Sequence, residues 1–552
     1  MMTYPMTTTT TNRSCQTSFL PFWAVVGLLC FTGVPGVWGR DNDDNHPVRI
    51  LVIGGGISGL AATRHLMTND AFSGKVSIDL LEAKADRLGG RLWTAQTNQG
   101  NKMDLGGMFW HGIESPIFAA LQSELNLTTV PTQGTSQNPG KGGAKWMVMH
   151  SNETVHELDE TAIDRRLPEL VGQWNRTMQK LVREHLLGLD NSTSVVGRPK
   201  DQDPTLLSQW SKDFIATLPE DDQRLLHFQL NMIFNLDLGL PMEQLALEGL
   251  MNGWDWNAGI GDDHVLLNGM SSVVEALAKD IMIPRPGKTT RIHKGQRVKK
   301  IHYTKTTSKS QCKVETENGQ VWEADACIVT LPLGVMKRHH TTLFDPPLDA
   351  SKQEALQRAG VGSLNSLVVQ WNRPICDEDT SAYYFLPVQH EDAFASSTLK
   401  PMSNNPLSHG FICSGLFRTG DPTITQFHFS ESNFVSTGNS TNAAERQQEM
   451  LQYWSRQAVE VVQHVLAMKS NNNNETLCHD ASSCRTARTT IDESDIVDLL
   501  WSDWVHDPDI LGSYSSAATE TNGNVDRQIL ARSSGSSLFF AGEHTHTNGR
   551  YQ

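Results

Sequence analysis

Apolar residues gather in short runs and in helical spacing along the chain, and the first such run is the most informative. Residues Val48–Ile53 are mostly apolar, and the chain then passes through Gly54, Gly56 and Gly59 into a helix-forming run, Leu60–Met67. This order predicts a buried strand, a glycine turn and a helix. The first glycine permits the tight turn, the second lets the backbone approach a pyrophosphate, and the third lets the helix pack on the strand. The N–H groups at the start of the helix would then bind phosphates.

A second apolar run, Val76–Leu81, is predicted to form the next strand and ends at Glu82. This carboxylate follows the glycines by about twenty residues, the distance at which an acidic side chain can bind a ribose hydroxyl. A glycine motif by itself also fits an ordinary glycine-rich turn. Together with Glu82, the motif predicts a dinucleotide site.

The next part of the chain has helical spacing. Ser115, followed by Pro116, caps one predicted helix, and longer helical stretches are predicted at residues 164–187, 206–235 and 443–468. No internal repeat is evident. The helical block after residue 115 is therefore predicted to be an insertion.

Strand patterns return in the second half of the chain. Residues 298–303 and 312–316 are predicted strands, and Asn318-Gly319 after them suits the mirror-image turn of a hairpin. A further apolar strand is predicted at residues 326–331.

Length and charge limit the possible functions. A chain of 552 residues is expected to form two domains, and its 38% hydrophobic content fits a globular protein. The net charge of −15 argues against nucleic acid as a partner, because phosphates require basic surface. The same charge is compatible with cationic substrates.

The N-terminus resembles a secretory signal peptide over residues 1–39. Arg13 precedes the apolar stretch Phe19–Val34, and Val37–Gly39 provides a cleavage point. The expected location is therefore secreted or in the lumen of the secretory pathway, with membrane contact only if the leader is an uncleaved anchor.

Glycosylation motifs and cysteines bear on the same question. The motifs, some of which arise by chance, begin at Asn126, Asn152, Asn175, Asn191, Asn439 and Asn474. Cys478 and Cys484 flank a short polar loop and are the expected disulfide pair, whereas Cys327 and Cys413 lie in apolar strands and are expected to be buried thiols.

Two further motifs carry a resemblance to a known family. Residues 87–91 read RLGGR and residues 104–112 read DLGGMFWHG. With the glycine turn, they resemble the flavin-containing amine oxidases: polyamine and spermine oxidases, monoamine oxidases, L-amino-acid oxidases and lysine-specific histone demethylases. The resemblance implies an α/β fold in which a Rossmann-type FAD-binding domain contains an inserted α+β substrate domain.

The same resemblance implies non-covalent FAD and a set of contacts to it. The implied cofactor-binding residues are Gly54, Gly56, Ser58, Gly59, Glu82, Arg91, Gly106, Gly107, Met108, Val298, Gly542 and Glu543. The implied FAD-binding segments are residues 48–114, 262–343 and 496–552, and the substrate domain would comprise residues 115–261 and 344–495.

The implied substrate site centres on His111, which would face the bound amine. Its near-neutral titration suits a group beside a cationic ligand, although such a histidine can also merely orient a loop. Trp110 and Tyr514 are candidate aromatic walls for an ammonium, or else core residues. A distant ammonium could bind acidic residues that are otherwise simply solvated, namely Asp255, Asp262 and Asp263. His544 and His546 beside Glu543 mimic a metal cluster, but no metal site is expected inside a flavin motif.

Two departures from the family pattern put catalytic turnover in question. Aligning residues 360–371 with the family places Ser366 where members carry a lysine that assists the reaction of reduced flavin with oxygen. After Glu543 the family continues into a helix that covers the flavin, whereas this sequence stops at Gln552, so the third FAD-binding segment is expected to be truncated.

The function that these features predict is an FAD-dependent amine oxidase, closest to polyamine oxidases. Its partners would be a polyamine and O₂, and its products an aldehyde, a shorter amine and hydrogen peroxide. One alternative is an L-amino-acid oxidase, which would need an arginine to clamp the carboxylate. Another is a secreted homologue that binds flavin without activity. A histone demethylase is disfavoured by the predicted leader.

Overall fold

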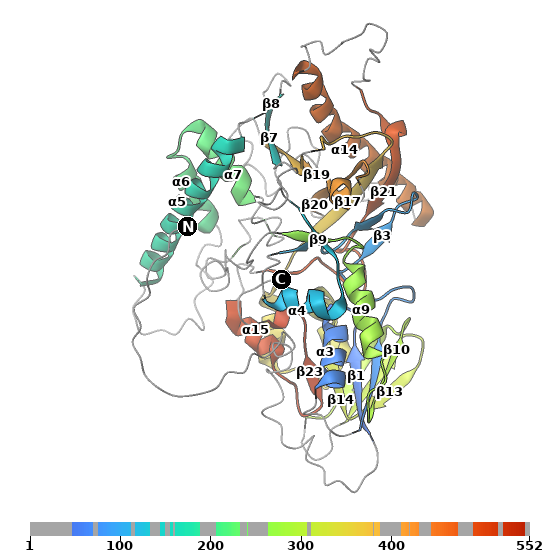
Figure 1. The fold of residues 1–552 in the computed structure, drawn as a ribbon. Helices are drawn as coiled ribbons and strands as arrows, with labels where there is room; N and C mark the ends of the chain where they lie inside the picture. Colours follow the sequence, from blue (N-terminus) through green and yellow to red (C-terminus); the bar gives the residue numbers. More distant parts are fainter. Residues whose placement is uncertain are drawn as a thin grey trace.

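The structure is a computed structural model of a mixed α/β chain with several sheets (Figure 1). It describes residues 47–69, 75–111, 116–132, 144–149, 155–157, 160–187, 206–231, 234, 240, 245, 263–305, 311–378, 380–386, 410–418, 420–429, 443–472, 490–516 and 523–546. The predicted leader at 1–39 lies outside these residues. No helix in the described ranges is both long enough and apolar enough to cross a membrane.

A parallel sheet gathers strands from distant parts of the sequence. Its order is β10-β2-β1-β14-β23, and each neighbouring pair is parallel. The strands are β1 (Val48–Ile53), β2 (Val76–Leu81), β10 (Lys288–His293), β14 (Ala326–Val329) and β23 (Leu538–Phe540). The two strands predicted at residues 48–53 and 76–81 are confirmed, and they lie side by side at the centre of the sheet.

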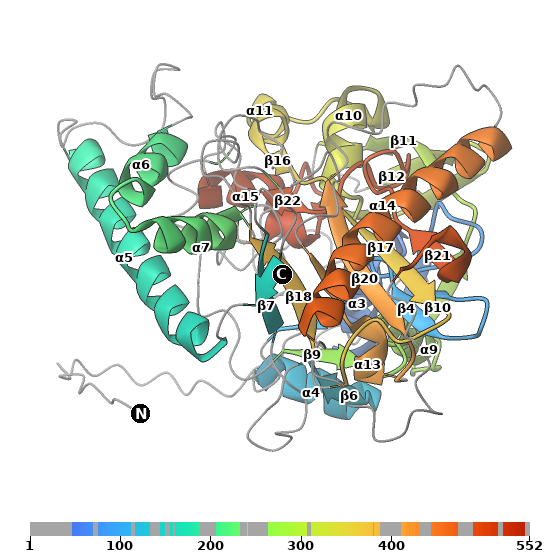
Figure 2. The same cartoon turned by 90° about the horizontal axis from the view of Figure 1, so that it is seen from above.

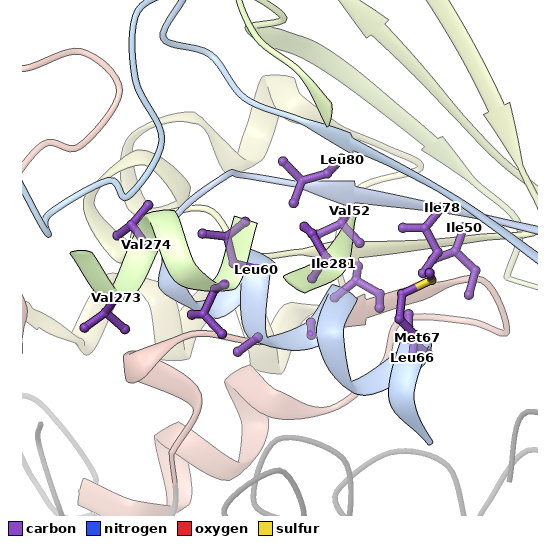
Figure 3. Close-up of a cluster of buried hydrophobic side chains, with 14 of the residues drawn as sticks. Ile50, Val52, Leu60, Leu66, Met67, Ile78, Leu80, Val273, Val274 and Ile281 are labelled. Atoms are coloured by element: carbon purple, nitrogen blue, oxygen red, sulfur yellow. The ribbon is translucent and has the colours of Figure 1, made fainter. Parts of the chain in front are cut away.

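Both faces of this sheet are covered, so its inner strands β1 and β14 are mostly apolar on both sides. On one face, Ile50 and Val52 pack with Leu60 of α3 (Ile57–Thr68) and Ile281 of α9 (Ser271–Ile281) (Figure 3). On the other face, the alternate strand residues pack against a second sheet and against α10 (Leu333–Leu343) and α11 (Ala350–Arg358). The glycine turn at the end of β1 is thus anchored in two hydrophobic cores.

The second sheet has the order β13-β12-β11-β15. Its strands are β11 (Val298–Tyr303), β12 (Cys312–Thr316), β13 (Val321–Ala324) and β15 (Phe344–Asp345). The hairpin is confirmed, but the mirror-image turn predicted at Asn318-Gly319 is wrong. Only Gly319 has a positive φ, of 84°, and its N–H donates to Thr316 O, which is the pattern of a three-residue loop ending in a bulge.

A seven-stranded sheet forms the other large layer, in the order β21-β17-β20-β19-β18-β7-β8. The strands are β7 (Ala144–Met149), β8 (Val155–Glu157), β17 (Leu364–Trp371), β18 (Ala382–Leu386), β19 (Gly410–Ile412), β20 (Thr423–Phe429) and β21 (Ile496–Trp501). The long helix α14 (Ala443–Asn472) lies across one face of this sheet (Figure 2). Part of its opposite face lines a cavity.

Helices α5 (Glu160–Leu187), α6 (Leu206–Ile215) and α7 (Glu220–Asn231) form a group at one side of the molecule (Figure 2). They share a core with Trp146 of β7 and Leu386 of β18. The helical stretch predicted at residues 206–235 is interrupted before α7, where Pro219 has no N–H to continue a helix.

Smaller elements complete the described chain. They are β3 (Thr94–Gln96), β4 (Lys102–Asp104), β5 (Phe109–Trp110), α4 (Pro116–Leu125), β6 (Thr129–Pro131), β9 (His264–Leu266), β16 (Gly360–Val361), α13 (Ser414–Arg418), η3 (Glu493–Asp495), β22 (Ser515–Ser516), α15 (Gly523–Ala531) and η4 (Glu543–Thr545). Among these, β5, β9 and β6 form a three-stranded sheet in that order.

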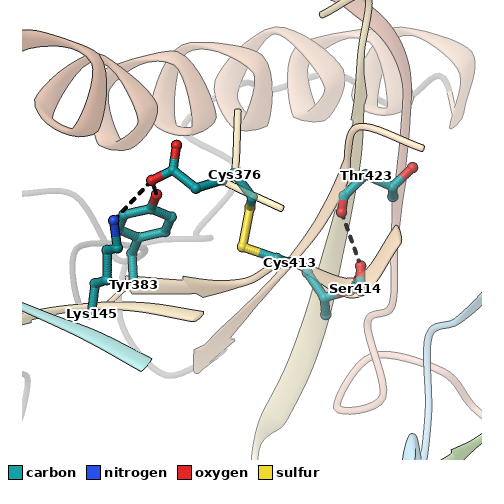
Figure 4. The surroundings of a disulfide bond; sticks show 8 residues. Lys145, Cys376, Tyr383, Cys413, Ser414 and Thr423 are labelled. Carbon is teal, nitrogen blue, oxygen red and sulfur yellow. Dashed lines mark hydrogen bonds and ion pairs between the residues drawn. A yellow bond between two sulfur atoms is a disulfide. The ribbon is translucent and has the colours of Figure 1, made fainter. Parts of the chain in front are cut away.

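Two disulfides correct the expectation for the cysteines. Cys312 is bonded to Cys327, and Cys376 is bonded to Cys413 next to β19 (Figure 4). The prediction that Cys327 and Cys413 are buried thiols is therefore wrong, because folding brings each to a partner that sequence spacing does not reveal. The pair predicted at Cys478 and Cys484 lies outside the described residues.

Candidate active site

A cavity of about 620 Å³ extends from the carboxyl ends of β1 and β2 to the seven-stranded sheet. One end is lined by the glycine turn after β1, and the other by side chains of β17, β18, β19 and β20. Ligands of parallel α/β sheets bind outside the carboxyl ends of the strands, so the first end is placed as a nucleotide site should be.

The glycines of the turn have different structural roles. Gly54 has a φ of +110°, a conformation that other residues rarely adopt. At Gly59 an added Cβ would lie 1.9 Å from Gly54 O, so this glycine allows α3 to pack against the turn. At Gly56 the nearest atom to an added Cβ is 3.9 Å away, and the residue lines the cavity beside Ser58. Of these three glycines, only Gly56 would hold an added Cβ without a clash, as expected where a ligand approaches the backbone.

Glu82 stands at the end of β2 and is 8% exposed. Its carboxylate accepts hydrogen bonds from Gly55 N at 2.7 Å and Lys84 N at 2.8 Å. Burial raises the pKa of Glu82, whereas these two hydrogen bonds act to lower it. The carboxylate is thus held rigidly at the cavity wall, where it could accept bonds from a ribose.

Arg91 and Glu543 meet at the cavity from opposite ends of the chain. Arg91 Nη1 lies 3.0 Å from Glu543 Oε1 and 2.7 Å from Ser513 O. Burial would raise the pKa of Glu543, but the charge of Arg91, helped by other nearby cationic groups and the Ser515 hydroxyl, lowers it to about 2. The side chain of Glu543 is 22% exposed, and it lines the cavity.

Two residues of this network were missed by the sequence analysis. Arg527 of α15 is 6% exposed and donates to Glu543 O at 2.8 Å and to Ser515 Oγ at 2.8 Å. The Ser515 hydroxyl in turn donates to the Glu543 carboxylate. No local motif marks either residue, because both act through contacts with Glu543.

The other predicted cofactor residues fall into two groups. Those that line the cavity are Gly106, Gly107, Met108 and Val298. Gly542 does not appear among the lining residues; with a φ of 151° it precedes η4 and directs Glu543 to the cavity. An open glycine turn, a fixed carboxylate and a guanidinium together fit the pyrophosphate and ribose of FAD.

The far end of the cavity is built on strand alternation. Successive side chains of a strand point to opposite faces, so Leu367 and Ile424 pack toward α14 while Ser366 and Phe427 face the cavity. The remaining strand residues that line this end are Leu364, Ala382, Tyr384, Gly410, Phe411, Ile412 and Thr425. Burial raises the pKa of Tyr384. This wall is therefore mainly apolar and aromatic, with a few hydroxyl groups.

His111 and Asp263 lie at the edge of the three-stranded sheet, and both line the cavity. His111 Nδ1 is 3.0 Å from Asp263 Oδ2. Asp255 and Asp262, predicted with Asp263 to bind a distant ammonium, lie outside the described residues. Tyr514, a predicted aromatic wall, also lines the cavity.

The placement of Trp110 corrects the sequence interpretation. Trp110 is 3% exposed and belongs to the hydrophobic core that includes Leu266, rather than to the cavity wall. Phe109 and His111 on either side of it line the cavity, and strand alternation therefore turns Trp110 to the opposite face. His544 and His546 lie beside Glu543 in the sequence. In the described parts of the chain, no group of three or more side chains is placed to bind a metal ion.

A parallel sheet with a glycine turn at the cavity and a carboxylate after β2 has the arrangement of a dinucleotide-binding site. The family model described as "Flavin containing amine oxidoreductase" matches residues 57–551. The chain belongs to this family, and the resemblance predicted from residues 87–91 and 104–112 is confirmed, together with FAD as the cofactor.

Curated relatives are similar over much of the chain. The bovine "Peroxisomal N(1)-acetyl-spermine/spermidine oxidase" is 27% identical over 60% of this chain and 63% of its own length. "Polyamine oxidase 4" of Oryza sativa is 26% identical over 90% of this chain and 84% of its own length. "Lysine-specific histone demethylase 1 homolog 3" of Arabidopsis thaliana is 24% identical over 90% of this chain and 28% of its own length. The alignment spans less than two thirds of the bovine and Arabidopsis proteins.

Proposed function

We propose that this protein is an FAD-dependent amine oxidase whose substrates are polyamines. In this proposal the glycine turn, Glu82 and Arg91 belong to a Rossmann-type FAD-binding domain, and the seven-stranded sheet with its helices forms an inserted substrate domain. The observation that carries the proposal is one cavity that joins the nucleotide-type turn at Gly56 to His111 and the apolar wall. Family membership and polyamine oxidases among the relatives support it.

The proposed reaction requires no covalent bond between the protein and its substrate. FAD would supply the acceptor for a hydride from the carbon next to the amine nitrogen, with O₂ as the final oxidant. The overall products would be hydrogen peroxide and, after hydrolysis of the imine, an aldehyde and a shorter amine. The side chains of this chain bind the amine, hold its carbon in place and accept its proton. The apolar wall at Phe427 and Ile412 excludes water from the reacting end of the substrate.

An L-amino-acid oxidase remains a second candidate, but one observation weighs against it. A substrate carboxylate is best recognised by a guanidinium that makes two parallel hydrogen bonds. Arg91 is the single arginine among the described residues that line the cavity, and its guanidinium already pairs with Glu543. A flavin-binding homologue without activity is the third candidate, because Ser366 replaces the charged group that the family resemblance implies.

We further propose that the protein acts in the secretory pathway or outside the cell. The predicted leader at 1–39 and the disulfides Cys312–Cys327 and Cys376–Cys413 support this location, since disulfides persist in oxidising compartments. Membrane contact is proposed only for a chain that keeps its leader.

The decisive test is anaerobic mixing of the FAD-loaded protein with spermine, N-acetylspermine, spermidine and a panel of L-amino acids. We expect polyamines to bleach the oxidised flavin band. Bleaching by amino acids alone would establish the second candidate. A bound flavin that no amine reduces would rule out the oxidase and leave the inactive homologue.

A further inference from the structure

His111 and Asp263 are direct neighbours across two strands. In the antiparallel pair of β5 and β9, Trp110 is opposite His264, so the next pair along the sheet is His111 and Asp263. Side chains directly opposite each other share a face and interact. The distance of 3.0 Å between His111 Nδ1 and Asp263 Oδ2 shows that these two side chains interact.

The third strand of this small sheet fixes the backbone of Asp263. Pro131 of β6 is also opposite His264, which places Thr132 opposite Asp263. Both the N–H and the hydroxyl of Thr132 donate to Asp263 O, each at 3.0 Å. His111, Asp263 and Thr132 therefore form a row across the end of the sheet, and all three residues line the cavity.

The carboxylate determines which nitrogen of the imidazole carries the proton. An ionised carboxylate only accepts hydrogen bonds, so Nδ1 of His111 must donate to Asp263. In the neutral ring this leaves the lone pair on Nε2. The phenyl ring of Phe109 lies against the imidazole, with 5.7 Å between ring centroids, and further restricts its orientation.

We propose that Asp263 is a positioning residue that makes His111 the base for the ammonium group of the substrate. The N–H bond of the ammonium breaks, a new N–H bond forms at Nε2, and the positive charge on the ring is stabilised by Asp263. The amine is left neutral, as hydride removal requires, and the proton is later released from Nε2 to water. This proposal rests on the proposed function, because it assigns His111 to an amine substrate.

The other charged groups of the described cavity wall are already engaged near the nucleotide end. Glu82 accepts from the N–H groups of Gly55 and Lys84, and the Lys84 ammonium pairs with Asp507. Arg91 pairs with Glu543, and Asp509 pairs with Arg297. The remaining titratable side chains of that wall are Tyr384 and Tyr514. Asp263 is therefore the carboxylate through which this wall can stabilise a charged His111.

Solvent weakens the pair in the free protein. The side chains of His111 and Asp263 are 39% and 44% exposed, so screening by water reduces their attraction before substrate binds. An amine that fills the cavity displaces this water and strengthens the interaction. The effect of Asp263 should thus be larger on flavin reduction than on the titration of the free protein.

The test compares the rate of anaerobic flavin reduction by a polyamine across pH for the FAD-loaded wild type, Asp263→Asn and Asp263→Glu. Asparagine can still accept from Nδ1 but lacks the charge. We expect Asp263→Asn to lower the reduction rate constant divided by the dissociation constant of the polyamine about 10- to 100-fold, and to move the acidic limb of its pH profile down by about one pH unit. Glutamate should restore part of the loss.

Two controls separate positioning from folding. Asp263→Asn in a His111→Asn background should produce no further loss, because the group that it serves is gone. Glu315→Gln removes the partner of another histidine, His302, at 3.0 Å and away from the cavity, and should leave the rate unchanged. Flavin content and melting temperature are measured for every variant.

An equal loss in both backgrounds, or an unchanged pH profile, would overturn the role of Asp263. A wild type that no amine reduces would instead refute the proposed function. The pairing then has its own readout, the NMR titration of ¹³C-labelled His111. Its pKa should be higher in the wild type than in Asp263→Asn by about half a unit, and equal values would overturn the proposal.

Discussion

Ser366 on β17 lies directly opposite Phe427 on β20, and both side chains face the cavity. The N–H of Ser366 donates to Ser502 Oγ at 2.9 Å, and the residue is 4% exposed. The wall at this point is therefore rigid, and its side chains are uncharged where the family resemblance implies a lysine.

This arrangement predicts that Ser366→Lys accelerates the reaction of reduced flavin with oxygen. A cation beside the flavin would stabilise the negative charge that develops on oxygen, and we expect the reoxidation rate to rise by about tenfold or more. The measurement is stopped-flow mixing of the dithionite-reduced protein with aerated buffer. Ser366→Met adds similar length without charge and should show no acceleration; an equal gain with methionine would point to cavity shape instead.

The different roles of Gly56 and Gly59 predict that alanine at Gly59 lowers stability, whereas alanine at Gly56 lowers FAD affinity. Gly59→Ala places a Cβ 1.9 Å from Gly54 O and should lower the free energy of unfolding by more than about 2 kcal/mol. Gly56→Ala places its Cβ in the cavity and should leave the apoprotein stable while weakening FAD binding at least about tenfold. Thermal melting of apoprotein and flavin titration distinguish the two. A large fall in the melting temperature of Gly56→Ala would contradict this assignment.

The depressed pKa of Glu543 predicts an acid-sensitive contribution to stability. Its value of about 2 in the folded chain lies below the ordinary value of 4.5, so the ionised form stabilises the fold at pH above 4.5. The contribution, roughly 3 kcal/mol, falls as pH drops from 4.5 toward 2. Urea unfolding should show the stability gap between wild type and Glu543→Gln shrinking by about 1 kcal/mol from pH 7 to pH 4. A constant gap would mean that Glu543 contributes only as a hydrogen-bond acceptor.

The disulfide Cys376–Cys413 predicts a stability that depends on the redox environment. It closes a loop with a sequence separation of 37, which by chain entropy stabilises the fold by about 4 kcal/mol. Lys145, Tyr383 and the disulfide lie on the same side of the seven-stranded sheet (Figure 4). Loss of the disulfide should therefore loosen the neighbouring strands β18 and β19. The double variant Cys376→Ser, Cys413→Ser should unfold at lower urea concentration, and an unchanged midpoint would show that the bond does not form.

Secretion predicts a glycan at Asn126. This residue is exposed, has a φ of 52° and follows α4 in a turn, where a glycosylating enzyme can reach it. In protein secreted from eukaryotic cells, Asn126→Gln should remove one glycan from the mass spectrum. Asn175→Gln is the matched control, because Asn175 is half-buried in α5 and accepts a hydrogen bond from Gln179. A protein that carries no glycan after passage through the secretory pathway would contradict the prediction for Asn126.

The cofactor end of the cavity could be predicted largely from local sequence. Strand, glycine turn and helix are encoded by neighbouring residues, and the residue after β2 must lie beside the turn once β1 and β2 pair. Arg91 and Glu543 were predicted as cofactor-binding residues from the family resemblance rather than from the local sequence pattern. Their contact with each other, and the roles of Ser515 and Arg527, could not be inferred because α15 and β22 reach the site only through folding.

The sequence by itself determined three strands of the parallel sheet (β1, β2 and β14), the glycine turn and the family, since these depend on periodicity, on backbone conformation and on short motifs. Only the tertiary structure decided which cysteines are bonded, that Trp110 faces the core, and that Asp263 meets His111. The physical reason is that a disulfide, the face of a short strand and a cross-strand pair depend on strand register. That register is fixed by packing among residues far apart in the sequence.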